Sequence, residues 1–371
     1  NNMINIRRFV EELKKNNLDF CSGVPDSLFK DLCFEFEKEF KKKHLTAANE
    51  GSAIALGIGY HLSSKKIPII YMQNSGLGNA INPLISLADK KVYNIPMFLI
   101  IGWRGETKKN FKDEPQHLTQ GKVTEKFLSN LSIKYKILNK NSDYKKIVKK
   151  LSEKAKKSNE LVALLVRKNT FESKNKVKVK NSKFLLREEV LNLILKKIPS
   201  KSIIVSTTGI LSRELNEMIK LKNLKLNNFM CVGGMGHAIS VAAGMASNLK
   251  KKVYCFDGDG AITMHLGSLA TSSKKNNIVH IILNNFSHES VGGHENSAKH
   301  VKFYRLAKEL GYKTTYLCKN KNEILQSIKK SQYSKKSTFI EIITKNGHRK
   351  NISRPKEKMI SLKNNFIKKV T

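Results

Sequence analysis

Short apolar runs alternate with segments of helical character along the chain, and this alternation limits the fold more than any other feature. In the first half, largely apolar runs lie at 67–72, 97–102 and 161–166. Such runs are typical of strands that are buried on both faces of a parallel sheet. Segments with helical spacing lie between them, at 51–62 and 79–87. We therefore predict an α/β fold of parallel strands covered by helices.

The second half of the chain repeats this alternation. Strands are expected at 202–206, 252–256, 278–283 and 338–343, and helices at 185–197, 238–246 and 265–272. We predict two doubly wound parallel-sheet domains, residues 1–170 and 184–371, joined by a polar, lysine-rich linker at 171–183. The basic final stretch, 345–371, is expected to be partly extended.

The charge of the chain is strongly positive. It contains 69 Lys and Arg against 30 Asp and Glu, a formal net charge of +39. Only nine of these residues are arginine, the residue that makes most base-edge and bidentate phosphate contacts. We favour a solvated lysine surface, which could also steer an anionic substrate. A basic polyanion-binding protein is the alternative from another functional class, although aromatic–arginine stacking motifs are lacking.

Cysteine usage and hydropathy exclude several other classes. The five cysteines are an odd number and form no C-x-x-C pair, so neither a disulfide framework nor a zinc site is expected. No apolar run approaches the roughly 20 residues of a membrane span, and no secretory signal is present at the start. We predict a cytoplasmic protein with no membrane partner.

Polar residues follow two successive strands of the second half. Asp259 lies between two glycines after the strand at 252–256, and Asn285 follows the strand at 278–283. Ligands of open α/β sheets bind at the carboxyl ends of strands, where glycines admit a phosphate and oxygen ligands hold Mg²⁺. Two ordinary turns are the alternative interpretation.

This pattern resembles the cofactor motif of the thiamine-diphosphate enzymes, in which Gly-Asp-Gly is followed by Asn-Asn. The resemblance implies thiamine diphosphate and Mg²⁺ as cofactors. Asp259, Asn285 and the carbonyl of Ser287 would hold the Mg²⁺ ion. The residues that would surround the diphosphate are Gly258, Asp259, Gly260, Ala261 and Asn285.

A glutamate in the first half resembles the catalytic glutamate of the same family. Glu50 is expected at a strand end, and small residues that open a helix follow it. In this family such a residue hydrogen-bonds the N1′ atom of the aminopyrimidine ring, so we expect Glu50 to be buried with a raised pKa. A first-turn glutamate that merely complements the helix dipole is the alternative.

A glycine-rich segment at 232–238 provides a third point of resemblance. By that resemblance, Met235 is the apolar wedge that bends the cofactor, and the carbonyl of Gly233 binds its 4′-amino group. A methionine between glycines is otherwise an ordinary packing residue.

Because the linker is short, a central third domain is absent, as in the phosphonopyruvate and sulfopyruvate decarboxylase branch of this family. Patches that resemble this branch lie at 22–27, 71–79, 101–105, 113–117, 264–271, 288–293, 347–349 and 354–355. The sequence departs from the branch at 286–287 and 294–296. The implied reaction is decarboxylation of 3-phosphonopyruvate to phosphonoacetaldehyde and CO₂ through the C2 carbanion of the cofactor, in phosphonate biosynthesis. Sulfopyruvate or another small 2-oxo acid is the alternative substrate.

Polar residues near strand ends of the first half are candidates for substrate contact. The expected phosphonate-binding residues are Ser27, Asn74, Ser75 and Arg104. Arg104 could bind a phosphonate bidentately, or could form a surface ion pair with Glu106 or Glu114. His117 is expected to relay a proton to the product carbon. Asp26 is expected only to cap a helix that begins directly after it.

The resemblance also implies an oligomer. In this family the catalytic glutamate and the diphosphate motif that serve one cofactor come from different subunits. We therefore expect at least a homodimer, with the cofactor at the subunit interface and a small molecule as substrate. No specific nucleic-acid partner is expected.

Overall fold

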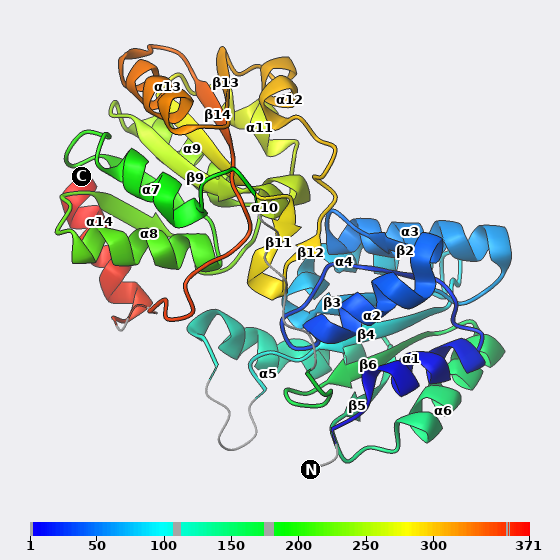
Figure 1. The fold of residues 1–371 in the computed structure, drawn as a ribbon. Coiled ribbons are helices and arrows are strands. Elements are labelled where there is room, and N and C mark those ends of the chain that lie inside the picture. Colours follow the sequence, from blue (N-terminus) through cyan, green and yellow to red (C-terminus); the bar gives the residue numbers. More distant parts are fainter. Residues whose placement is uncertain (1–2, 107–112, 174–181, 354, 356) are drawn as a thin grey trace. The chain divides into compact units, whose positions relative to one another are not determined.

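The computed structural model divides the chain into two compact units, Asn1–Val177 and Lys178–Thr371 (Figure 1). It describes residues 3–106, 113–173, 182–353, 355 and 357–371. Each unit contains one six-stranded parallel sheet with flanking helices, which confirms the predicted α/β class. The predicted linker at 171–183 includes residues outside the described ranges, so the predicted domain boundaries stay predictions.

The sheet of the first unit has the strand order β2-β1-β3-β4-β6-β5. Its strands are β1 (Cys21–Gly23), β2 (His44–Thr46), β3 (Ile69–Gln73), β4 (Met97–Gly102), β5 (Lys134–Leu138) and β6 (Leu161–Val166). Its helices are α1 (Ile6–Lys15), α2 (Lys30–Phe40), α3 (Glu50–Ser64), α4 (Leu77–Pro83), α5 (Pro115–Asn130) and α6 (Tyr144–Ser158). The strands β4 and β6 have the predicted bounds. β3 begins later than predicted, after Pro68, which has no N–H group for the ladder.

Two apolar clusters cover the two faces of this sheet. Phe98 and Ile100 of β4 pack with α1, α2 and α6, while Leu99 and Ile101 pack with α3, α4 and α5. Successive residues of a strand point to opposite faces, so a strand covered on both sides must be apolar throughout. This explains the continuous apolar runs.

The sheet of the second unit has the order β13-β14-β10-β9-β7-β8. Its strands are β7 (Ile203–Ser206), β8 (Asn227–Met230), β9 (Val253–Gly258), β10 (Ile278–Asn284), β13 (Thr314–Cys318) and β14 (Thr338–Ile343). Its helices are α7 (Arg187–Leu195), α8 (Ile210–Leu221), α9 (Ala238–Asn248), α10 (Asp259–Met264), α11 (Ser268–Ser272), α12 (Phe303–Glu309), α13 (Lys321–Tyr333) and α14 (Met359–Val370). A small antiparallel pair, β11 (Ser287–His288) and β12 (His294–Glu295), follows β10.

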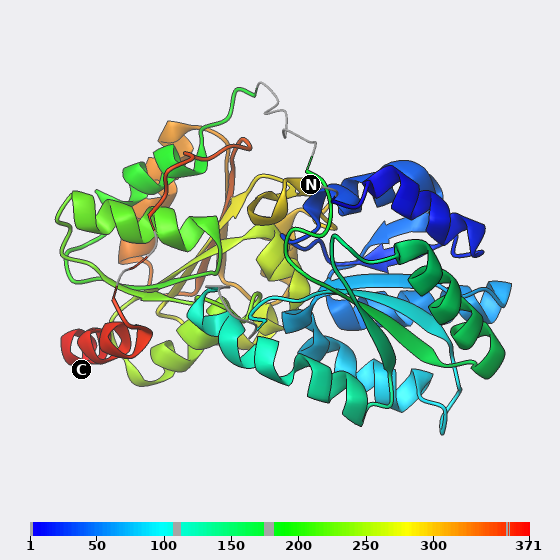
Figure 2. The same cartoon turned by 90° about the horizontal axis from the view of Figure 1, so that it is seen from below.

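Local structure in this unit differs from the prediction at one helix. The helix expected at 265–272 is present as α11 but begins only at Ser268, and α10, which starts directly at Asp259, was not predicted. The end of the basic final stretch forms α14, the red helix in Figure 2, which packs beside β8. Phe366 of this helix is buried against Phe229, with ring centroids 5.7 Å apart.

The five cysteines are free thiols, as expected. Among the described residues, no helix combines the length and the apolar character that crossing a bilayer requires.

The loop after β4 touches α5 backbone to backbone. A Cβ atom on Gly121 would lie 1.7 Å from the carbonyl oxygen of Gly105, and one on Gly105 would lie 1.8 Å from that of His117. The indole of Trp103 donates a hydrogen bond of 3.0 Å to the carbonyl of Gly121. This contact fixes the strand end that carries Arg104 beside the helix that carries His117.

We expect Gly121→Ala to lower the free energy of unfolding by about 1–3 kcal/mol, because the new methyl group meets rigid backbone. Gly59→Ala in α3 is the matched control, since its Cβ meets nothing within 4 Å. Alanine is the better helix former, so the control should be neutral or more stable by up to about 1 kcal/mol. Urea unfolding measures both, and equal midpoints for the two variants would contradict the close contact.

Candidate functional site

The predicted site residues lie in two groups, one on each unit, next to the carboxyl ends of strands. In the second unit, Asp259 directly follows β9 and Asn285 directly follows β10. These two strands are hydrogen-bonded neighbours, with Leu283 opposite Gly258. The parallel register therefore brings the two predicted Mg²⁺ ligands to the same edge of the sheet.

Asp259 and Asn285 share a hydrogen-bond donor at this edge. Asp259 is 3% exposed and accepts a hydrogen bond from the backbone N–H of Ser287. The same N–H lies 3.2 Å from Oδ1 of Asn285. Burial raises the pKa of Asp259 to about 7, so this carboxylate lacks a compensating charge. A carboxylate, an amide oxygen and a backbone carbonyl are the ligands that Mg²⁺ prefers, so these residues fit the predicted ion.

The β11–β12 hairpin lies against these ligands. Nδ2 of Asn296 donates a hydrogen bond of 2.6 Å to Oδ2 of Asp259. A Cβ on Gly260 would lie 2.7 Å from Nδ1 of His288, so glycine is required for this approach. Burial lowers the pKa of His288 to about 4, which leaves the imidazole neutral. Asn296 was not predicted, because it lies in the stretch that departs from the family pattern.

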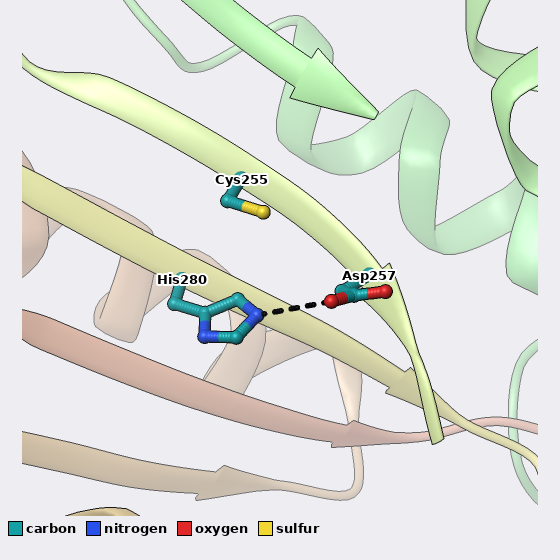
Figure 3. A group of neighbouring side chains, drawn as sticks. All are labelled: Cys255, Asp257 and His280. Carbon is teal, nitrogen blue, oxygen red and sulfur yellow. Dashed lines mark ion pairs between the residues drawn. The ribbon is translucent and has the colours of Figure 1, made fainter. Parts of the chain in front are cut away.

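Near the segment 258–260, three buried side chains lie on one face of the sheet (Figure 3). His280 of β10 is opposite Cys255 of β9, and Asp257 is two residues further along β9. Oδ1 of Asp257 accepts a hydrogen bond of 2.9 Å from the N–H of Gly258, and Oδ2 lies 3.5 Å from Nε2 of His280. Asp257 thus ties the first residue of the turn to the strands.

The same three side chains could also hold a metal ion. Their ligand atoms lie within 4.8 Å of one another, a grouping that the cysteine spacing did not predict. Sulfur and imidazole ligands suit Zn²⁺ rather than Mg²⁺, so this group differs chemically from the oxygen ligands around Asp259. Burial raises the pKa of Cys255 well above its ordinary value, which disfavours the thiolate that a metal would require.

The glycine-rich segment between β8 and α9 packs against α10. Gly234 and Gly236 have φ angles of +63° and +90°, which glycine adopts without strain. A Cβ on Gly236 would lie 3.0 Å from the carbonyl oxygen of Ala261. Met235 and Gly233 are half-buried within this segment. Their contacts with a cofactor stay predictions.

In the first unit, Glu50 is the first residue of α3 and is 6% exposed. The side chain of Asn49 caps the helix by accepting a hydrogen bond of 2.9 Å from the N–H of Ser52. Asn79 donates a hydrogen bond of 2.8 Å to Oε2 of Glu50, and a Cβ on Gly76 would lie 2.4 Å from Oε1. Burial raises the pKa of Glu50, the direction that its predicted role requires.

Asp113 binds Arg104, a predicted substrate residue, and His117, the predicted proton relay, and Arg104 in turn binds the predicted substrate residue Ser27. Arg104 donates to both of its carboxylate oxygens, with 2.8 Å between Nε and Oδ2, and Nη1 of Arg104 donates to Oγ of Ser27 at 3.0 Å. Nδ1 of His117 lies 2.9 Å from Oδ1 of Asp113. Hydrogen bonds from Arg104 and His117 outweigh burial and hold the pKa of Asp113 well below its usual range.

The partner of Arg104 therefore differs from the expected ones. The alternative expected from the sequence was a surface ion pair with Glu106 or Glu114, whereas the bidentate partner is Asp113 and the pair is mostly buried. Asp113 could have been chosen from its spacing, because it lies four residues before His117. Burial lowers the pKa of His117, so a neutral imidazole is favoured near pH 7.

The two other predicted substrate residues differ in their surroundings. Asn74 is 4% exposed; its Nδ2 donates to the carbonyl of Arg104 at 2.8 Å and to Oγ1 of Thr124 at 3.0 Å. Its Oδ1 accepts from the N–H of Arg104 at 3.2 Å. Asn74 thus supports the backbone of Arg104.

Ser75 is exposed and accepts a hydrogen bond from Gln73 at 2.8 Å. Substrate contact by Asn74 and Ser75 stays a prediction.

Asp26 is a candidate proton donor that the sequence analysis missed. Its expected role as a helix cap is wrong, because α2 begins only at Lys30. Its side chain is fully buried, and Oδ2 has no hydrogen-bond partner. A Cβ on Gly102 would lie 1.6 Å from Oδ2. Burial raises the pKa of Asp26 to about 6, although the charge of Arg104 opposes this shift.

Two family models match the chain, one on each unit. The model described as "Thiamine pyrophosphate enzyme, N-terminal TPP binding domain" matches residues 6–128. The model described as "Thiamine pyrophosphate enzyme, C-terminal TPP binding domain" matches residues 208–342. Thiamine pyrophosphate (TPP) is another name for thiamine diphosphate. Glu50 lies within the first match, and Asp259 and Asn285 lie within the second.

Three named relatives are similar to the chain. Phosphonopyruvate decarboxylase of Streptomyces viridochromogenes is 28% identical over 354 residues, which cover 90% of this chain and 87% of the relative. Sulfopyruvate decarboxylase of Methanosarcina acetivorans is 24% identical over 362 residues, which cover 92% of this chain and 91% of the relative. Sulfopyruvate decarboxylase subunit beta of Methanocaldococcus jannaschii is 35% identical over 131 residues, which cover 34% of this chain and 68% of the relative.

The raised pKa of Asp26 predicts a specific dependence of stability on pH. Because its pKa is about 6 in the folded protein and 3.8 ordinarily, folding favours the protonated form. The contribution is fully present below pH 4 and is lost as the pH rises through 6. The unfolding free energy of the wild type, minus that of Asp26→Asn, should therefore fall by about 2 kcal/mol between pH 4 and 7. Denaturant unfolding at several pH values measures this, and a pH-independent difference would contradict the raised pKa.

Proposed function

The chain belongs to the thiamine pyrophosphate-dependent decarboxylases, the family of phosphonopyruvate and sulfopyruvate decarboxylases, and on that premise we propose that its substrate is 3-phosphonopyruvate. The products would be phosphonoacetaldehyde and CO₂, and the reaction would serve phosphonate biosynthesis. The observation that supports an anionic substrate is the cluster in which Asp113 binds Arg104 and His117, and Arg104 binds Ser27. The choice of a phosphonate follows the similarity to phosphonopyruvate decarboxylase over 90% of the chain. This cluster combines a fixed guanidinium with neutral hydrogen-bonding groups, as recognition of an anionic phosphonate requires.

Arg104 has donors left for an anion. A guanidinium carries five N–H donors. Its described hydrogen bonds use two of them on Asp113 and one on Ser27. The remaining two could bind phosphonate oxygens without loss of the existing contacts. Because Asp113 and the backbone contacts of Asn74 hold the residue in place, little side-chain freedom would be lost on binding.

Glu50 and the second-unit ligands would hold the cofactor. Thiamine diphosphate, when bound, supplies the group that accepts the electron pair left by departing CO₂. Asp259, Asn285 and the carbonyl of Ser287 would hold Mg²⁺ on its diphosphate. The carboxyl of Glu50, whose raised pKa favours the protonated state, would hold a proton on the aminopyrimidine ring nitrogen.

Two residues of the first unit could deliver the proton that replaces CO₂ on the product carbon. His117 is held by Asp113 through Nδ1, so Nε2 could take up a proton from solvent and pass it to the product carbon. Asp26 has its unpartnered Oδ2 as the alternative donor. We favour His117, because its orientation is fixed by a charged partner.

We also propose that the protein is a cytoplasmic homodimer or higher homo-oligomer. Glu50 and the Mg²⁺ ligands lie on different units of the chain. The resemblance to the family would place the two halves of one site on different subunits.

Sulfopyruvate remains the alternative substrate, since a sulfopyruvate decarboxylase is related over 92% of the chain. Sulfonate differs from phosphonate by one charge and a proton, so the same donors could serve it. A basic polyanion-binding protein is the alternative from another class, based on the net charge of +39. Its binding would weaken steeply with salt and would not depend on Mg²⁺ or thiamine diphosphate.

We expect CO₂ release from phosphonopyruvate that requires Mg²⁺ and thiamine diphosphate and exceeds release from sulfopyruvate and pyruvate. Glu50→Gln should lose about 10²–10⁴-fold in kcat, because the amide cannot transfer the proton. Glu153→Gln, on the exposed face of α6, is the control and should keep full activity. Faster release from sulfopyruvate would overturn the proposed substrate but not the cofactor.

Arg104→Lys should raise the KM for phosphonopyruvate about 10–100-fold, because lysine keeps the positive charge but lacks the planar guanidinium that Asp113 orients. The KM for pyruvate, which lacks the phosphonate, should change by less than about 3-fold. Steady-state kinetics with both substrates measure the contrast. An equal change for the two substrates would mean that Arg104 does not contact the phosphonate.

A further inference from the structure

A buried network of charged groups surrounds Glu289, four residues after the predicted Mg²⁺ ligand Asn285. The side chain of Glu289 is 9% exposed. Its Oε2 accepts a hydrogen bond of 2.9 Å from Nδ2 of Asn285 and also accepts from Nη1 of Arg187. Its Oε1 accepts from the N–H of Gly347 and lies 3.2 Å from Nδ1 of His348. Four groups thus hold this carboxylate in one position.

Arg187 is itself fixed from another side. It is the first residue of α7, and its side chain is 8% exposed. Its Nε and Nη2 atoms donate to the two carboxylate oxygens of Glu214 on α8, at 2.6 and 3.1 Å. This bidentate contact sets the plane of the guanidinium and leaves Nη1 for Glu289.

A second contact ties the same loop to α8. Oγ of Ser290 accepts a hydrogen bond of 3.2 Å from the N–H of Ile210. A Cβ on Gly209 would lie 2.6 Å from that hydroxyl, so Gly209 allows the loop to approach this closely. The segment after β10 is therefore attached to the start of α8 by Ser290 and to α7 through Glu289.

These contacts determine which end of the Asn285 amide is available to a cation. Because the NH₂ group donates to Glu289, Oδ1 lies on the opposite side, where it accepts from the N–H of Ser287 at 3.2 Å. Rotation of the amide by half a turn would place Oδ1 against the Glu289 carboxylate, and like partial charges repel. Only the oxygen end of an amide can bind Mg²⁺.

We propose that Glu289 is a positioning residue for Mg²⁺ binding and that Arg187 anchors it. Glu289 holds the amide of Asn285 with its oxygen toward the ion, and it does not itself contact the ion. This role rests on the proposed cofactor. It explains why three charged side chains are buried together, although buried ion pairs contribute little net stability.

The test is a calorimetric titration of Mg²⁺ into the full-length protein at saturating thiamine diphosphate. Glu289→Gln should raise the dissociation constant for Mg²⁺ about 10–100-fold, as outer-shell substitutions do. Glu217→Gln is the matched control. Glu217 binds Arg349 and Ser353, so it holds the same C-terminal segment from α8. The control should bind Mg²⁺ like the wild type.

A double-mutant comparison separates positioning from general loss of structure. If Glu289 acts through Asn285, then Glu289→Gln should cause no further loss in the Asn285→Ala background. Additive losses in the double variant would overturn the proposal. If Glu289→Gln does not fold, Arg187→Lys tests the same chain of contacts. Lysine keeps the positive charge but lacks the planar guanidinium that binds Glu214 and Glu289 together.

The outcomes distinguish this inference from the proposed function. A wild-type protein that binds no Mg²⁺ with thiamine diphosphate would overturn the proposed function. Equal Mg²⁺ affinity in the wild type and in a folded Glu289→Gln protein would overturn the positioning role alone.

Discussion

The parallel register between β9 and β10 is the constraint on which the rest of the second unit depends. It sets Leu283 opposite Gly258, so the two strands end together. Asp259 and Asn285 are then neighbours, although a full helical crossover separates them in sequence. The apolar faces of both strands are buried, so a slip of one residue would move every side chain to the wrong face. The site geometry is thus fixed by the packing of the core.

Burial gives the candidate residues their chemical character. Glu50, Asp26 and Asp259 are carboxylic acids with little or no exposure, and burial raises the pKa of each. Asp113 shows the opposite shift, because Arg104 and His117 donate to it. The carboxyl groups of the candidate residues therefore differ in the direction of their pKa shifts, which is typical of sites that transfer protons.

Strand and helix bounds were predicted most accurately where one local rule determines the structure. The apolar runs at 97–102 and 161–166 became β4 and β6 with unchanged bounds, because a strand buried on both faces must be apolar throughout. The helix expected at 265–272 begins only at Ser268, and α10 before it was not predicted, because the order of polar and apolar residues does not show that a helix begins at Asp259. Asp26 was read as a helix cap because a local rule cannot show that its surroundings are buried.

The α/β class follows from patterns within short segments of the chain, and the type of cofactor follows from the resemblance of its short motifs to those of a known family. Such patterns reflect the local geometry of strands, turns and phosphate-binding loops, so one sequence suffices to see them. The partners of the site residues could be found only in the folded molecule. Glu289 joins Asn285 to Arg187, and Asn296 reaches Asp259, across long stretches of sequence. Hydrogen bonds and pKa shifts depend on distance and burial in space, and neither quantity is encoded in any local segment.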